Sequence, residues 1–363
     1  MIRARRRNAP SLLGPRLDPA VFGGSFALSM LALAVGAWTG VLHDETPSWA
    51  WLPAIVLVDV AHVWATAART YLDPVERAAR RQLFALAPMV GLVVSAALFS
   101  LGPLVFWRSL TYLAIFHFVR QQYGWVALYR ARAGDDGRIG RIVDTAAIYA
   151  ATLYPLLYWH AHVPRRFSWF VPGDVAALPP SLLRALLPLG FAAWALALTA
   201  YVVRAVALRA QGRANPGKDV VVVTTAIAWY LGIVTFDSDY AFTVTNVFMH
   251  GIPYLALVFV QSTPRGAGAD IGSGRPVPPA VTRAVWFLGA LWAVAFAEEL
   301  LWDRAVWHDR EWLFGEGWAL ERWQRIVVPL LALPQLTHYV LDGFIWRRRR
   351  NPRLAALVAP PAA

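Results

Sequence analysis

The stretch IVVPLLALPQLTHYVLDGFIWRRRR, residues 326–350, decides how the rest of the chain is interpreted. It is a long apolar run that ends at four consecutive arginines, which predicts a membrane-spanning helix ending at the cytoplasmic interface. The run nevertheless carries His338 and Asp342, which are four residues apart and therefore share one helix face. An aspartate near the bilayer centre costs about 2.5–3.5 kcal/mol on insertion scales. We therefore expect this helix to meet polar partners inside the protein.

The composition of the whole chain indicates an integral membrane protein. Of 363 residues, 58% are hydrophobic and only 15% are charged, and the mean hydropathy is +0.46. The chain has no cysteine, which excludes disulfides, zinc–thiolate sites and iron–sulfur clusters. The formal charge of +12 would suit a nucleic-acid partner. The arginines, however, lie in short loops between apolar runs, so the positive-inside rule explains them better and no nucleic acid is expected.

The apolar runs predict an all-α, polytopic integral membrane helix bundle of about ten transmembrane helices. The predicted spans are 21–41, 49–68, 83–101, 103–127, 142–158, 182–203, 220–236, 241–260, the short 284–297, and 326–346. Residues 1–20 are predicted to form a basic cytoplasmic N-terminal segment, residues 21–350 the transmembrane domain, and residues 351–363 a disordered cytoplasmic tail.

The basic residues predict the orientation of these spans. An even number of spans puts both termini on one side, and most of the 34 Lys and Arg residues fall in the loops of that side. Cytoplasmic loops carry this excess. The first run is too long for a cleaved signal sequence. We therefore expect a multi-pass protein of a bacterial-type inner (plasma) membrane, with both termini in the cytoplasm.

Four histidines lie within predicted spans, and each has a carboxylate or an amide about one helical turn away. The pairs are Asp59 with His62, His117 with Gln121, Asn246 with His250, and His338 with Asp342. All four pairs lie on spans that descend from the outer side, and the histidines sit about 14–21 Å deep at about 1.5 Å per residue. Four imidazoles in one layer predict a single metal centre, in which the carboxylates and amides orient the histidines and raise their basicity.

Other interpretations remain open for the same residues. A single histidine in a helix is usually a hydrogen-bonded packing residue. The set would also suit a polar network, or the proton or ion pathway of a transporter. Four histidines also suit two b-type haems held as bis-His pairs in an electron carrier, although such pairs usually lie at two depths.

The absence of thiolates narrows the chemistry of a metal centre. Fe(II) is the first candidate for a histidine-dominated site, and zinc and copper also accept imidazole. A centre within the bilayer suits a hydrophobic small molecule or lipid, such as a sterol, quinone or polyene, that enters from the membrane. These features predict O₂-dependent hydroxylation, desaturation or double-bond cleavage.

Two short motifs carry a resemblance to a known family. His338-Tyr-Val-Leu-Asp342-Gly and His250-Gly-Ile-Pro253 resemble the His–acid and His–Pro elements of the Brp/Blh-type membrane carotene dioxygenases. This resemblance implies an iron ion held by the four histidines and the cleavage of a carotenoid. The clustered HxxxH and HxxHH boxes of membrane desaturases are absent from the sequence, which argues against a di-iron desaturase.

Overall fold

The computed structural model describes residues 9–262 and 279–359, and within these ranges the regular elements are helices and none is a strand. The predicted all-helical fold is therefore confirmed. The chain divides into two compact units. Unit 1 comprises Met1–Pro47, Thr111–Pro253 and Pro352–Ala363, and unit 2 comprises Ser48–Leu110 and Tyr254–Asn351.

Within the described ranges, eight helices are long and apolar enough to cross a membrane. They are Pro19–Thr39, Ser48–Thr70, Pro74–Leu101, Pro180–Ala210, Pro216–Thr235, Asp239–Ser262, Ala280–Trp307 and Glu321–Ile345. The predicted count of about ten spans is therefore not confirmed. The two remaining runs, 103–127 and 142–158, lie in the long helices α5 (Pro103–Ala133) and α6 (Arg138–Ala161). Both helices carry charged residues within these runs, among them Arg120 and Asp144.

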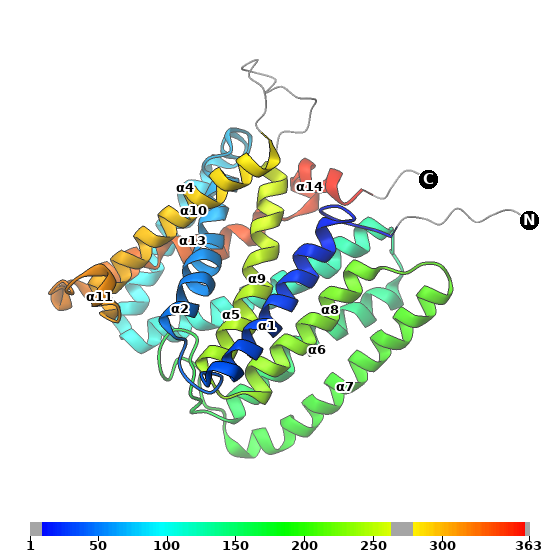
Figure 1. Ribbon diagram of the computed structural model, residues 1–363, viewed down its shortest axis with the longest axis horizontal. Coiled ribbons are helices and arrows are strands. Elements are labelled where there is room, and N and C mark those ends of the chain that lie inside the picture. Colours follow the sequence, from blue (N-terminus) through cyan, green and yellow to red (C-terminus); the bar gives the residue numbers. More distant parts are fainter. Residues whose placement is uncertain (1–8, 263–278, 360–363) are drawn as a thin grey trace, which may run out of the picture. The chain divides into compact units, whose positions relative to one another are not determined.

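Unit 1 is built around α6, α7 (Pro180–Ala210) and α8 (Pro216–Trp229), which run beside one another (Figure 1). It also holds η1 (Pro19–Gly23), α1 (Gly24–Thr39), η3 (Tyr230–Thr235), and the larger parts of α5 and α9 (Asp239–Ser262). Gly190 of α7 lets this helix approach α6 closely, because a Cβ atom there would lie 2.7 Å from a methyl carbon of Leu157. Aromatic side chains fill the core, among them Phe118, Trp159 and Trp229.

A buried charge cluster joins four helices of unit 1. Asp144 of α6 is fully buried and accepts hydrogen bonds from Arg130 of α5 at 2.5 Å and from Lys218 of α8 at 2.8 Å. Arg204 of α7 reaches Asp144 at 3.2 Å and Asp135, in the loop after α5, at 2.8 Å. Each cation is thus paired with a carboxylate where it leaves water, which is the condition for burying charges.

Unit 2 packs two helical hairpins through apolar side chains. The first consists of α2 (Ser48–Trp51), the π-helical segment η2 (Leu52–Val60), α3 (Ala61–Thr70) and α4 (Pro74–Leu101). The second consists of α10 (Ala280–Trp302), η4 (Asp303–Trp307), α11 (Glu311–Phe314), η5 (Glu321–Trp323), α12 (Gln324–Leu331) and α13 (Leu333–Ile345). Helix α3 contacts both α10 and α13, and α4 contacts α12 and α13.

The ninth predicted span, 284–297, is too short compared with the structure. The helix runs from Ala280 through η4 to Trp307, past Glu298 and Glu299. It continues because the buried carboxylate of Glu298 accepts hydrogen bonds from the indole N–H groups of Trp64 at 2.5 Å and Trp302 at 3.3 Å. A carboxylate with two donors is far less costly to bury than a free one.

The C-terminal part of the chain also differs from expectation. The run predicted as one span, 326–346, does lie in one membrane-length helical segment, Glu321–Ile345, but this segment is interrupted at Ala332 between α12 and α13, since Pro334 in the first turn of α13 has no N–H to continue the earlier helix. The tail predicted to be disordered from residue 351 instead forms α14 (Pro352–Leu357), whose Leu354 is fully buried. Residues 360–363 of that tail, and residues 1–8 of the N-terminal segment, lie outside the described residues.

Candidate metal centre

Two of the predicted histidines meet in unit 1. His117 comes from α5 and His250 from α9, and both side chains are buried. Their ring centroids are 5.0 Å apart, with the rings edge to face at 80°. Phe118 stacks on His250 with centroids 3.5 Å apart and the rings 7° from parallel. This stacking holds the plane of the His250 ring, so that the ring edge is presented in one direction.

The two predicted amide partners also lie in unit 1. Gln121 donates from Nε2 to the backbone carbonyl of His250 at 2.8 Å, and Asn246 donates from Nδ2 to the carbonyl of Phe242 at 2.9 Å. The amide nitrogens therefore bond the backbone of α9. Within the described part of the chain, the buried oxygens Gln121 Oε1 and Asn246 Oδ1 have no hydrogen-bond partner. Buried acceptors normally have a hydrogen-bond donor. These two oxygens are therefore available to accept from a water molecule or from a polar group of a ligand.

The other two histidines meet in unit 2. His62 of α3 and His338 of α13 are buried, with ring centroids 4.8 Å apart and the rings at 84°. His62 follows directly after η2, and π-helical segments are often found at functional sites. Asp59, in the last turn of η2, places Oδ1 3.5 Å from His62 Nδ1. That separation is too long for a good hydrogen bond.

A hydroxyl group lies between His338 and its predicted partner. Asp342 Oδ1 is 3.8 Å from His338 Nδ1, which is too far for a hydrogen bond, whereas Thr66 Oγ1 is 2.6 Å from that nitrogen. Tyr254 Oη lies 2.5 Å from Thr66 Oγ1 and donates to Asp342 Oδ1 at 2.6 Å. Trp346 donates from Nε1 to the same oxygen at 3.3 Å. Asp342 therefore acts on His338 through Thr66 and Tyr254.

Our interpretation of the sequence did not include Thr66 and Tyr254, although a signal for both was present. Thr66 follows His62 by four residues, and Tyr254 follows His250 by four residues. These are the same one-turn spacings that pointed to the carboxylates and amides. An uncharged hydroxyl group costs less to bury in a span than a charged group does, so it demands a partner less strongly. Nothing in the sequence therefore separates these two residues from packing residues.

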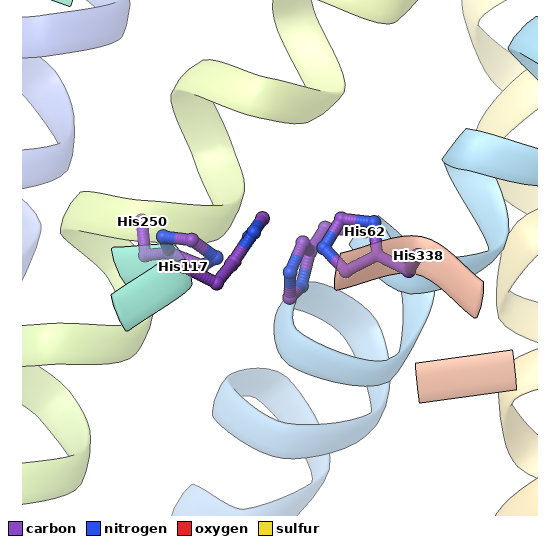
Figure 2. A group of neighbouring side chains, drawn as sticks. All are labelled: His62, His117, His250 and His338. Carbon is purple, nitrogen blue, oxygen red and sulfur yellow. The ribbon is translucent and has the colours of Figure 1, made fainter. Parts of the chain in front are cut away.

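All four histidines belong to one group in the structure. Each offers one ring nitrogen, and these four nitrogens lie within 4.8 Å of one another (Figure 2). Metal–imidazole bonds of about 2.0–2.1 Å place two ligand nitrogens roughly 3.3 Å apart in a tetrahedral site and roughly 4.2 Å apart when they are opposite. The donor set, four imidazoles and no thiolate, suits iron, zinc or copper.

No protein-family model matches the chain, and no curated protein or solved structure is similar to it. The motif-level resemblance to the carotene dioxygenases therefore stays a prediction. The function has to be argued from the residues themselves.

Proposed function

We propose that this chain is a membrane-embedded metal-dependent oxygenase, in which His62, His117, His250 and His338 hold one ion, Fe(II) by preference. The observation that carries the proposal is the convergence of four buried ring nitrogens within 4.8 Å. All four imidazoles are buried, and neutral imidazole is the commonest metal ligand in proteins. Zinc and copper remain alternative ions for the same donors.

A single ion explains the group better than two separate pairs do. Two separate sites would have two histidines each, and a two-histidine site leaves a metal ion without the third and fourth protein ligands that it normally has. Two bis-His haems would each require a separate pair with a porphyrin between its rings. The edge-to-face contact of His62 with His338, at 4.8 Å between centroids, leaves no room for one.

The nearby carboxylates support a divalent ion. Asp59 lies 3.5 Å from His62, and Asp342 is joined to His338 through Thr66. With both acids ionised, their two negative charges balance an M²⁺ ion, which reduces the cost of holding that ion away from water. Carboxylates that contact metal-bound histidines also fix the ring orientation and raise the basicity of the ligand nitrogen.

The membrane environment supports a hydrophobic substrate. Eight helices within the described ranges are long and apolar enough to cross a bilayer. Together with the arginines in the loops between the apolar runs, this supports our proposal of a bacterial-type inner membrane protein with both termini in the cytoplasm. A centre within such helices is reached most directly by a lipid or polyene dissolved in the bilayer. When bound, iron would supply the activation of O₂. The chain supplies the ring nitrogens, their orientation, and the exclusion of water.

Metal analysis of the detergent-purified protein tests this proposal. We expect one iron ion per chain and no Soret band in the optical spectrum. The double variants His62→Ala/His338→Ala and His117→Ala/His250→Ala should each lose the whole ion, because each removes half of its ligands. His160→Ala is the control, since His160 bonds Tyr112 and lies outside the group.

Two results would reject the single-ion centre. One is a double variant that keeps half of the metal, which would indicate two independent sites. The other is metal content that no histidine substitution changes. A Soret band lost in the same variants would instead assign the histidines to haem.

A further inference from the structure

Four side chains of unit 2 form a continuous hydrogen-bonded chain behind His338. His338 Nδ1 lies 2.6 Å from Thr66 Oγ1, Thr66 Oγ1 lies 2.5 Å from Tyr254 Oη, and Tyr254 Oη lies 2.6 Å from Asp342 Oδ1. His338, Thr66 and Tyr254 are each no more than 2% exposed. The chain ends at a carboxylate, and it links residues from α3, α9 and α13.

The hydrogens available to this chain determine its direction. Each hydroxyl group has one hydrogen to donate, and an ionised carboxylate only accepts. Tyr254 donates its single hydrogen to Asp342. The contact of 2.5 Å between the two hydroxyl oxygens therefore needs the hydrogen of Thr66. The other acceptor for that hydrogen, Asp342 Oδ1, is more distant, at 3.4 Å. With that hydrogen used, the contact of Thr66 with His338 Nδ1 needs a hydrogen from the imidazole.

We propose that Thr66 and Tyr254 are positioning residues that fix His338 as the Nδ1–H tautomer and so present its Nε2 lone pair as the metal ligand. A neutral imidazole has one protonated and one free nitrogen, and the partner of one nitrogen decides the state of the other. The tautomer follows from the hydrogen-bond chain alone. Its use by a metal rests on the proposed function.

The same chain also fixes the orientation of the ring. Trp346 donates from Nε1 to Asp342 Oδ1 at 3.3 Å, so the carboxylate at the end of the chain is held from α13 as well as from α9. Rotation of the buried His338 ring would break its bond to Thr66, and Thr66 Oγ1 would then lose the N–H group that donates to it. Loss of such a partner typically lowers metal affinity about 10–100-fold.

Nitrogen NMR of the metal-free protein tests the tautomer. The protein is labelled with ¹⁵N in its histidine rings, purified in detergent micelles, and its His338 signal is assigned by comparison with His338→Ala. We expect a protonated Nδ1 and an unprotonated Nε2 in the wild type and in Thr66→Ser. Thr66→Val and Tyr254→Phe should give mixed tautomers, because each removes one link. Thr152→Val is the matched control, since this buried hydroxyl donates only within its own helix, to the carbonyls of Ile148 and Tyr149.

Zinc binding gives the second measurement. Titration with Zn²⁺ against a chelator should show about 10–100-fold weaker binding for Thr66→Val. Wild-type affinity should return in Thr66→Ser and be kept in Thr152→Val. If Thr66 contributed only to folding, Thr66→Val would lower the stability without changing the tautomer of His338. The two measurements therefore distinguish a positioning role from a structural one.

The outcomes distinguish this inference from the proposed function. A protonated Nε2 in the wild type would overturn the inference, because the chain would then run from Asp342 toward His338. An unchanged His338 signal in Thr66→Val would also overturn it. A pinned Nδ1–H tautomer in a protein that binds no metal would support the inference and reject the proposed function.

Discussion

Substitution of Asp144 by alanine should destabilise unit 1 more than any single surface change. Asp144 is fully buried in α6 and accepts from three cations, Arg130, Arg204 and Lys218. Asp144→Ala leaves these three positive charges with Asp135 as the remaining carboxylate of the cluster. The Lys218 ammonium then loses its only carboxylate contact within the described ion pairs.

The size of the effect follows from the burial of the cluster. Removing one partner of a buried ion pair costs about 3–5 kcal/mol, chiefly because the other charge stays buried without compensation. At about 1.4 kcal/mol per factor of ten, the unfolded fraction should rise roughly 100- to 4,000-fold. Asp237→Ala is the matched control, because Asp237 pairs with Arg165 at 2.8 Å with 45% of its side chain exposed. The Arg165 side chain is 5% exposed but keeps its bond to the carbonyl of Phe236, so we expect a loss near the value of about 0.2–1 kcal/mol that exposed pairs contribute.

Denaturant unfolding in detergent micelles, followed by tryptophan fluorescence, measures both variants. Asp144→Asn keeps the shape and one acceptor oxygen, so we expect an intermediate loss and a folded protein even where Asp144→Ala does not accumulate. The reasoning is refuted when Asp144→Ala and Asp237→Ala lose the same free energy of unfolding, or when Asp144→Ala falls within about 1 kcal/mol of the wild type.

Three further predictions concern other parts of the chain. Burial raises the pKa of Asp135, but the hydrogen bond from Arg204 and the neighbouring cations outweigh it, so the net pKa lies below its usual range. A carboxylate with a lowered pKa stabilises the fold above its unfolded pKa of about 3.9, and this contribution is lost as the pH falls below that value. The free energy of unfolding, measured from pH 6 to 3, should therefore depend less on pH in Asp135→Asn than in the wild type. Gly217→Ala should cost about 1–3 kcal/mol in the same unfolding assay, because a Cβ atom there would meet the ring of Tyr129. Gly289→Ala, with open space around its Cβ position in a helix interior, should instead be neutral or stabilise by about 0.5–1 kcal/mol. Fe²⁺ at 100 times its dissociation constant should raise the free energy of unfolding by about 2.7 kcal/mol, and a variant that lacks any one of the four histidines should show no such gain.

The features that could be predicted from sequence are those that a single helix determines. Apolar runs of sufficient length predict helices wherever they occur, because helix formation satisfies the backbone locally. The four histidines could be selected for a related reason, since a polar side chain in an apolar run requires a partner. The length of α10 could not be predicted, because it depends on Trp64, an indole donor from a different helix, that bonds Glu298.

Asp342 illustrates why the contacts within the candidate site could not be predicted from spacing. Residues four apart share a helix face, and this rule correctly pairs Asp342 with His338 on α13. The rule does not say that the two side chains touch, and a gap of 3.8 Å remains between them. Donors from other elements satisfy the carboxylate better, and the hydroxyl of Thr66 fits between acid and imidazole. Because Thr66 lies one turn after His62 on α3, the helix that supplies one proposed ligand also holds the ring of another in place. A change at residue 66 should therefore affect metal affinity through His338 while leaving the contact between Asp59 and His62 intact.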